Sequence, residues 1–363
     1  MNSSKFILRP MEESDIPGVM DLRLRVKELG VPEKNNPDFW RWENFQNPYG
    51  PTMAMIALTG EEVISHIALL PRRLWVNGKS YSCCMALESM TDRRFRAKGL
   101  FPRLWFELKP RHQAKEISIL FGFPNRYARP IFHKGFKWLD VGSPQLRAYP
   151  FRPGQVLRSR GGLASSLLSL PAAAGGFLYR LPFKFKPSGR VSQASAFDER
   201  FQPLLDEIHG RHPIILERSV DYLNWRYLKA VARNYTALFV TMDDSETVAG
   251  YLVYSRALYE ELVLGVVMDL QISENAPDGL GEEMLSTALW QMNKDGAHLA
   301  LSLSMPADPI NRVLRRRGFF FVSRKFNPNP FDLMIELCDK KLNREVLTNP
   351  DHWRLGFGDI DVF

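Results

Sequence analysis

Apolar residues in the first third of the chain recur in short runs, and turn residues separate successive runs. The paired runs and their turns are residues 53–58 and 63–70 around Thr59-Gly60, and residues 74–76 and 80–90 around Asn77-Gly78. Asn-Gly fits the two-residue turns that connect antiparallel strands. Runs of this length between turn residues are typical of strands, so the pattern predicts two successive β-hairpins.

A different spacing, with apolar residues three and four positions apart, predicts helices before and after these hairpins. Residues 15–29, with Ser14 as their N-cap, and residues 102–114 have this amphipathic pattern. Apolar runs at residues 6–10 and 117–122 predict two further strands. Strand-rich sheets with few helices indicate the α+β class, with a mixed, mostly antiparallel central sheet flanked by helices.

The same order of elements recurs in the second half of the chain. Strands are expected there at residues 237–242, 248–255 and 299–305, and helices at residues 281–294 and before Gly318. Trp40 and Trp225 lie 185 positions apart, as do Val63 and Val248. Because order and spacing are both preserved, the pattern indicates an internal duplication.

A linker is expected between the two repeats. We predict an N-terminal domain over residues 1–150, a linker over 151–195 and a C-terminal domain over 196–363. Within the linker, residues 161–179 carry no charged side chain. This stretch is expected to be an interdomain helix or linker, and a helix lying on a membrane surface is the alternative. Its Ser, Gly and Pro171 make a membrane span the least favoured structure.

Charge and cysteine content narrow the class of protein. The 363 residues have a formal net charge of +8, which suits anionic partners such as CoA, a nucleotide-sugar or an anionic membrane surface. The basic residues are scattered and no nucleic-acid-reading motif occurs, so we expect no nucleic-acid partner. Three cysteines without disulfide or metal-ligand spacing, and an N-terminus without an apolar signal segment, predict a cytoplasmic protein without a metal site.

The basic turn at residues 96–101 is the strongest candidate for a binding site. It follows the apolar run at 80–90 and precedes the helix at 102–114. Backbone N–H groups in such a turn and at a helix N-terminus point towards a bound anion, and Gly99 permits close approach. We therefore predict a diphosphate site. Its residues are Met90, Thr91, Arg94, Arg96, Ala97, Lys98, Gly99, Leu100 and Phe101. The corresponding residues 278–283 of the second repeat are acidic, so only the first repeat is expected to bind this cofactor.

This turn resembles motif A of the GNAT superfamily of acetyl-CoA-dependent N-acetyltransferases, written R/Q-x-x-G-x-G/A. Arg96 and Gly99 take the first and central positions, and Phe101 replaces the final small residue. Residues 120–125 and 132–136 resemble motif B. Further segments resemble a bacterial branch with two GNAT-like halves that often accompanies surface-polysaccharide biosynthesis. These segments are residues 39–51, 65–79, 121–125 and 353–363.

The resemblance implies tandem GNAT-like domains that move an acetyl or other short acyl group from acetyl-CoA, or another acyl-CoA, to a small-molecule amine such as an amino-sugar. It implies a carboxylate base on the strand before the turn, where Glu88 lies; a surface salt bridge with a neighbouring arginine is the alternative for Glu88. The tyrosine that protonates the leaving thiolate is missing from its usual position, and Tyr127 and His133 are the nearest substitutes.

Four further residues are candidates for ligand contacts. Asn125 follows the strand at residues 117–122 and is expected either to hydrogen-bond the pantetheine arm or to cap a helix. His66 is a candidate for the substrate cleft, although a structural hydrogen bond is the favoured role. Asp359 and Asp361 lie two apart near the C-terminus, so their carboxylates point the same way and could bind an acceptor ammonium. An exposed acidic tail is the favoured alternative for these two residues.

Two other functions fit parts of the sequence. A Fem-type aminoacyl transferase is also built from two such halves, and the positive net charge would suit aminoacyl-tRNA, but such enzymes normally lack the CoA phosphate loop. A non-catalytic acyl-CoA-binding protein is compatible with Phe101 and with the missing tyrosine. Of these functions we expect the enzyme, and we expect it to be a monomer or a homodimer. Peripheral membrane contact through residues 161–179 is left as an alternative.

Overall fold

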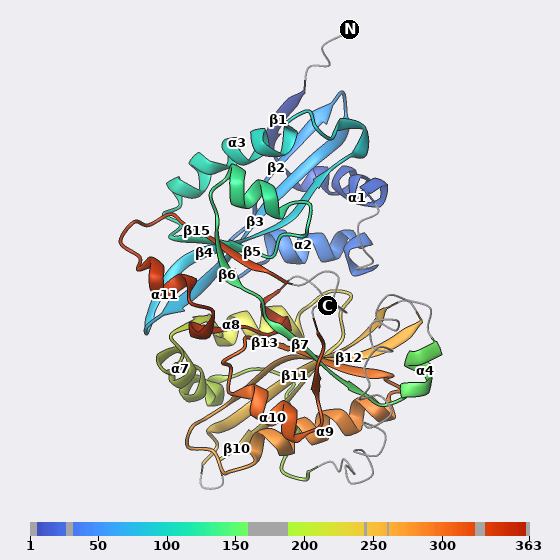
Figure 1. Cartoon of the computed structure of the whole chain (residues 1–363), viewed down its shortest axis with the longest axis vertical. Coiled ribbons are helices and arrows are strands. Elements are labelled where there is room, and N and C mark those ends of the chain that lie inside the picture. Colours follow the sequence, from blue (N-terminus) through green and yellow to red (C-terminus); the bar gives the residue numbers. More distant parts are fainter. Residues whose placement is uncertain are drawn as a thin grey trace. The chain divides into compact units, whose positions relative to one another are not determined.

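The computed structural model describes residues 6–26, 32–158, 188–242, 245–259, 261–323 and 331–360 (Figure 1). The chain divides into two compact units. The first comprises Met1–Val141, Ala230–Ala232 and Leu333–Thr348, and the second comprises Gly142–Lys229, Arg233–Asp332 and Asn349–Phe363. Each unit contains a mixed sheet flanked by helices, which confirms the predicted α+β class.

The sheet of the first unit has the strand order β1-β2-β3-β4-β5-β15-β6. These strands are β1 (Ile7–Pro10), β2 (Met53–Thr59), β3 (Glu62–Val76), β4 (Lys79–Thr91), β5 (Ile119–Gly122), β15 (Leu333–Leu337) and β6 (Leu139–Gly142). β1 to β4 are antiparallel neighbours, which confirms both predicted hairpins, whereas β4 and β5 are parallel. The predicted runs at 63–70 and 74–76 form one continuous strand, β3.

Helices bury both faces of this sheet. The helices of the unit are α1 (Ile16–Val26), α2 (Pro37–Phe45), α3 (Leu100–Ala114), the π-helical turn η4 (Ile131–Gly135) and α11 (Arg344–Thr348). Met55 and Ala57 of β2 pack in a cluster with α3, whereas Ile56 and Leu58 pack with α1. Successive side chains of a strand point to opposite faces, so a strand covered on both sides is apolar throughout. The predicted Ser14 cap is wrong, because Ser14 lies inside a 3₁₀ turn that Glu12 caps.

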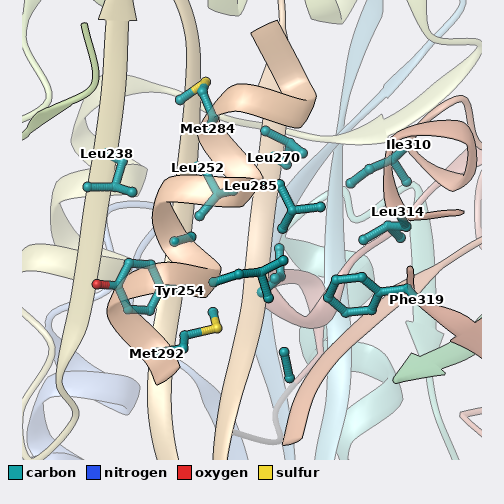
Figure 2. Packing of buried hydrophobic residues seen from close by; sticks show 14 of the residues in the cluster. Leu238, Leu252, Tyr254, Leu270, Met284, Leu285, Met292, Ile310, Leu314 and Phe319 are labelled. Carbon is teal, nitrogen blue, oxygen red and sulfur yellow. The ribbon is translucent and has the colours of Figure 1, made fainter. Parts of the chain in front are cut away.

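The sheet of the second unit has the order β14-β7-β13-β12-β11-β10-β8. These strands are β14 (Phe320–Phe321), β7 (Gln145–Pro150), β13 (Leu299–Ser304), β12 (Leu262–Ile272), β11 (Val248–Tyr259), β10 (Tyr235–Thr241) and β8 (Ser192–Gln193), and the main helices are α7 (Gln202–Arg211), α9 (Leu280–Lys294) and α10 (Ile310–Arg316). Figure 2 shows Met284, Leu285 and Met292 of α9 packed with Leu252 and Leu270 of the sheet.

The two sheets exchange one strand each. β7 follows the first unit along the chain but pairs antiparallel with β13 of the second sheet. β15 follows the second unit along the chain but pairs antiparallel with β5 of the first sheet. The unit boundary therefore falls after Val141 rather than at residue 150, because backbone pairing assigns β7 and β15 to the sheets they join.

Residues 161–179, which are candidates for a membrane contact, lie outside the described part of the chain. Among the helices that the structure describes, none is both long enough and apolar enough to cross a bilayer.

Candidate functional site

The parallel strands β4 and β5 part at the centre of the first sheet. Cys83 to Ala86 pair with Ile119 to Gly122, but residues 87–91 of β4 continue alongside β3 alone. Among the strands that the structure describes, none pairs with the other edge of this segment. Unpaired strand edges hydrogen-bond readily to extended amide-containing ligands, so this edge can receive one.

A β-bulge lies at this opening. The β3–β4 register shifts between His66 and Ala68, and Glu88 has a φ of 47°. A bulge bends its strand and re-aims side chains, often beside functional sites. Left-handed backbone at a non-glycine residue is strained and persists only where neighbouring groups hold it.

The turn at residues 97–101 presents free backbone donors. Within the described residues, the N–H groups of 97–101 donate no hydrogen bond. Gly99 is the N-cap of α3 with a φ of 70°, and a Cβ built on it meets no atom within 4 Å. A helix N-terminus with open, unpaired amides is an anion site. The diphosphate prediction therefore has the backbone geometry that it needs.

The basic side chains near this turn differ in their availability. Arg94 forms ion pairs with Asp92, at 2.8 Å, and with Glu62, and the hydrogen bond from Arg94 holds the pKa of Asp92 well below its usual range. Arg96 donates to the Thr91 carbonyl at 3.3 Å, and Lys98 lies 5.1 Å from the Phe95 ring centroid. Both Arg96 and Lys98 are exposed. Arg94 is thus committed to carboxylates, in contrast to its predicted role at a phosphate.

Phe101, which departs from the motif, packs away into an aromatic cluster. Its ring centroid lies 5.8 Å from that of Phe132 and 5.5 Å from that of Phe136. Met90 is also buried, in the cluster beside α1, and Thr91 Oγ1 lies 2.8 Å from Ser65 Oγ. These three residues can therefore contribute to a ligand site through their backbone.

Glu88 is buried in a cluster of charges. Its carboxylate pairs with Lys34 Nζ at 2.5 Å and with Arg23 Nη1 at 3.0 Å, and Lys34 also lies 3.6 Å from Glu43. The Glu88 side chain is 8% exposed and that of Lys34 is 1% exposed. The salt bridge expected as an alternative is present, but it is buried, and its partners come from helices far away in the sequence. Sequence reasoning missed Arg23 and Lys34 because no local motif marks them.

His66 lies beneath the bulge. Its Nδ1 is 2.8 Å from the Glu88 carbonyl oxygen, and its ring meets Trp40 edge-on at 5.9 Å between centroids. Burial lowers the pKa of His66, so the ring is neutral and Nδ1–H donates to that carbonyl. The side chain is fully buried, and the prediction that it faces the substrate cleft is corrected to a structural hydrogen bond.

The three candidate residues in and beside motif B, namely Asn125, Tyr127 and His133, are exposed. Asn125 Oδ1 accepts from the N–H groups of Tyr127 and Ala128, both at 3.0 Å, so it caps the turn. Tyr127 is 68% exposed. His133 Nδ1 lies 3.3 Å from an Asp140 carboxylate oxygen at the surface. The capping alternative for Asn125 is thus the contact that the structure contains.

In the second unit, the C-terminal segment fills the corresponding opening between parallel strands. β12 and β13 pair through Val267 and Ser302 and then part. A Cβ built on Gly356 would lie 2.9 Å from Met268 O of β12 and 3.8 Å from Leu303 O of β13. The segment therefore lies between the two strands, and no extended ligand can enter there while it remains.

Asp359 belongs to this filling segment. It is 1% exposed, and its carboxylate pairs with Arg218 at 2.8 Å. Arg218 also binds Asp269 at 3.0 Å. Both the acceptor role and the exposed-tail alternative are therefore wrong for Asp359, because tertiary packing buries it. Asp361 lies outside the described residues.

Comparison with protein families identifies the domain in the first unit. Residues 8–138 match the model of the acetyltransferase (GNAT) domain. This match confirms the predicted enzyme class, a GNAT-type N-acetyltransferase. No curated protein matches the chain.

Solved structures share the fold across nearly the whole chain. N-myristoyltransferase of Saccharomyces cerevisiae with bound myristoyl-CoA has a TM-score of 0.67 at 12% identity, over 100% of this chain and 86% of that chain. A GCN5-related N-acetyltransferase of Anabaena variabilis has a TM-score of 0.61 at 11% identity, over 92% of this chain and 73% of that chain. A probable N-acyltransferase of Enterococcus faecalis has a TM-score of 0.57 at 9% identity, over 92% of this chain and 72% of that chain. At these identities the likeness concerns the fold.

Proposed function

We propose that the first unit binds an acyl-CoA and transfers its acyl group to a primary amine. One observation carries this proposal: residues 87–91 of β4 run past the end of the pairing with β5, and the chain then continues through the 3₁₀ turn Arg93–Phe95 to the free amides of residues 97–101 at the start of α3. The amides suit a diphosphate, and the strand edge suits an extended arm that contains amide groups. Bound acyl-CoA would supply an acyl group activated as a thioester.

Each part of the site then has a chemical task. The backbone amides of residues 97–101 would stabilise the diphosphate charge, and the exposed Arg96 and Lys98 would add to the positive field. The β4 edge would align the arm so that its reactive end lies near the bulge. Orientation of this kind lowers the barrier by fixing the reacting groups in advance.

Proton transfer is proposed for three residues. Glu88 is the proposed base because it lies at the bulge beside the opening, where its carboxylate pairs with Lys34 and Arg23 and still has oxygen lone pairs that can accept a proton. Tyr127 and His133 are proposed as donors to the leaving thiolate because both are exposed on the segment that follows β5. Asn125, whose side chain caps the turn, could support the arm through its position beside the strand end.

The remaining assignments rest on the resemblance to two-domain GNAT-like proteins and on the filled opening between β12 and β13. We propose a cytoplasmic enzyme with a small-molecule acceptor, an amino-sugar used in surface-polysaccharide biosynthesis. We further propose that the second unit is a duplicated GNAT-like copy without a donor site, because residues 353–359 occupy its opening and the turn before α9 is acidic.

Gly99→Glu tests the donor site. A carboxylate at the start of α3 would repel the diphosphate, and we expect the Kd for acetyl-CoA to rise about tenfold or more, which corresponds to about 1.4 kcal/mol. Isothermal calorimetry measures it.

Gly279→Glu is the matched control. Gly279 caps α9 with a φ of 83° and has the same open surroundings, so both variants carry the same backbone strain. A Kd that rises equally in both variants, or in neither, would contradict the proposed donor site.

A further inference from the structure

We propose that His66 and Lys34 are positioning residues that hold Glu88 in the bulged conformation that keeps β4 open to the acyl donor. The inference rests on the proposed function for its catalytic consequence. Its structural part, the stability of the bulge, can be measured without any ligand.

The bulge needs support from its surroundings. Glu88 is not a glycine, yet its φ is 47°. A residue held in this region relaxes to extended backbone unless other contacts prevent it. If Glu88 relaxed, the β3–β4 register shift between His66 and Ala68 would be lost, and the segment after it would change its direction.

His66 holds the backbone of Glu88. Nδ1–H donates to the Glu88 carbonyl at 2.8 Å from a fully buried ring. A buried hydrogen bond of this kind is hard to break, because the carbonyl would be left without a partner away from water. The ring itself is fixed by the edge-on contact with Trp40.

Lys34 holds the side chain of Glu88. Its Nζ lies 2.5 Å from Glu88 Oε1, and its own backbone carbonyl accepts a hydrogen bond from Trp40 Nε1 at 2.7 Å. Trp40 therefore contacts both holding residues. Arg23 adds a second cation to the same carboxylate at 3.0 Å. The backbone and the side chain of one strained residue are thus fixed independently.

The second unit contains a parallel arrangement. Tyr251 lies 185 positions after His66, the spacing of the repeat, and its hydroxyl donates to Asp269 at 2.9 Å. Arg218 pairs with the same carboxylate, and the β11–β12 register shifts between Val253 and Tyr254. A bulge in the corresponding strand thus again has a ring donor and a buried cation, in a unit whose opening is filled. In the second unit both groups contact the Asp269 carboxylate, whereas in the first unit His66 holds the backbone carbonyl of Glu88 and Lys34 holds its carboxylate.

Two substitutions of His66 test the backbone contact. His66→Asn keeps an N–H donor near the position of Nδ1, whereas His66→Leu removes it. We expect His66→Leu to raise the KM for acetyl-CoA about tenfold with a smaller change in kcat, and to speed amide hydrogen exchange at residues 87–91; His66→Asn should stay within about threefold of the wild type. Equal impairment of both variants, or unchanged exchange in His66→Leu, would overturn the proposal.

Two substitutions of Lys34 test the side-chain contact. Lys34→Met removes the positive charge. Lys34→Arg keeps a positive charge and introduces an arginine, the residue type that occupies position 218 in the second unit. We expect faster exchange at residues 87–91 in the first variant only. Failure of wild-type protein to bind acetyl-CoA in calorimetry would reject the proposed function, whereas the exchange rates still decide whether His66 and Lys34 hold the bulge. Wild-type exchange in Lys34→Met would reject the role of Lys34.

Discussion

Ion pairing and burial together decide which charged residues of this chain can reach a ligand. The exposed Arg94 and the buried Asp359 each form ion pairs with other side chains, and Glu88 is held by two buried cations. Arg96 and Lys98 remain exposed beside the free amides. Paired and buried charges mainly fix the conformation of their own segment, and their removal leaves an uncompensated partner. Neighbouring basic residues such as Arg94 and Arg96 therefore differ in their availability to a ligand.

His209 makes the folded state sensitive to acid. It is 5% exposed, its Nε2 accepts a hydrogen bond from the Arg218 N–H at 3.0 Å, and burial followed by the Arg218 charge lowers its pKa from 6.5 to about 4. Above pH 6.5 the His209 ring is neutral in both the folded and the unfolded state. Between pH 6.5 and about 4 only the unfolded state gains the proton, so the free energy of unfolding should fall by up to about 1.4 kcal/mol per pH unit.

Urea unfolding across this pH range measures the effect. His209→Gln removes the titrating ring. In this variant the free energy of unfolding should depend less steeply on pH, by up to the slope given above. Identical slopes for wild type and variant would show that His209 does not contribute.

At the scale of elements, each of the two units contains a left-handed glycine followed by a long helix. α3 and α9 are both 15 residues long and both follow a left-handed glycine, Gly99 or Gly279. No described strand enters the opening between β4 and β5, whereas residues 353–359 enter the opening between β12 and β13. The same strand–turn–helix pattern therefore occurs beside an opening without a described strand in one unit and beside an opening filled by a segment of the chain in the other.

Gly358→Ala should destabilise the filled opening. A Cβ at this position would collide with Tyr227 Oη and lie 3.1 Å from the Met268 carbonyl oxygen. Overpacking of this kind costs about 1–3 kcal/mol of the free energy of unfolding, which denaturant titration can measure.

Gly210→Ala provides the control for this substitution. Gly210 is in α7, and a Cβ there meets no atom within 4 Å, so the change should be neutral or stabilising by up to about 1 kcal/mol. If Gly358→Ala were as stable as Gly210→Ala, residues 353–359 would not be tightly packed between the strands.

At the scale of the whole molecule, the exchanged strands couple the folding of the two units. β5 has β15 as its antiparallel neighbour, and β13 has β7. Each sheet therefore needs a strand from the far side of the sequence boundary. A cut at residue 150, which the repeat pattern suggested, separates β15 from its sheet and leaves β7 without its partner.

A fragment of residues 1–150 should consequently fail to fold alone. It would expose the edge of β5 and the unpaired β7, both prone to aggregation. We expect no cooperative thermal unfolding from it. Co-expressed fragments 1–170 and 171–363 retain both strand pairs between them and should copurify. A cooperative unfolding transition in the isolated 1–150 fragment would contradict this coupling.

Local signals in the sequence determined the hairpins, the main helices and the turn at Gly99. Asn77-Gly78 fits a tight turn, and a strand followed by a glycine and an amphipathic helix needs only neighbouring residues to be recognised. The pattern of strands and helices correctly predicted mixed sheets flanked by helices, and the motif indicated the acetyltransferase domain, which residues 8–138 match.

Tertiary structure alone decided the partners of the buried charges, the exchange of β7 and β15, and the filling of the second opening. Lys34 precedes Glu88 by 54 residues, and Asp359 follows Arg218 by 141. Such contacts depend on where whole elements pack, and the hydrophobic pattern specifies which face of an element is buried but not which distant segment covers it. The side chains that hold Glu88 and Asp359 therefore could not be identified from residues near them in the sequence.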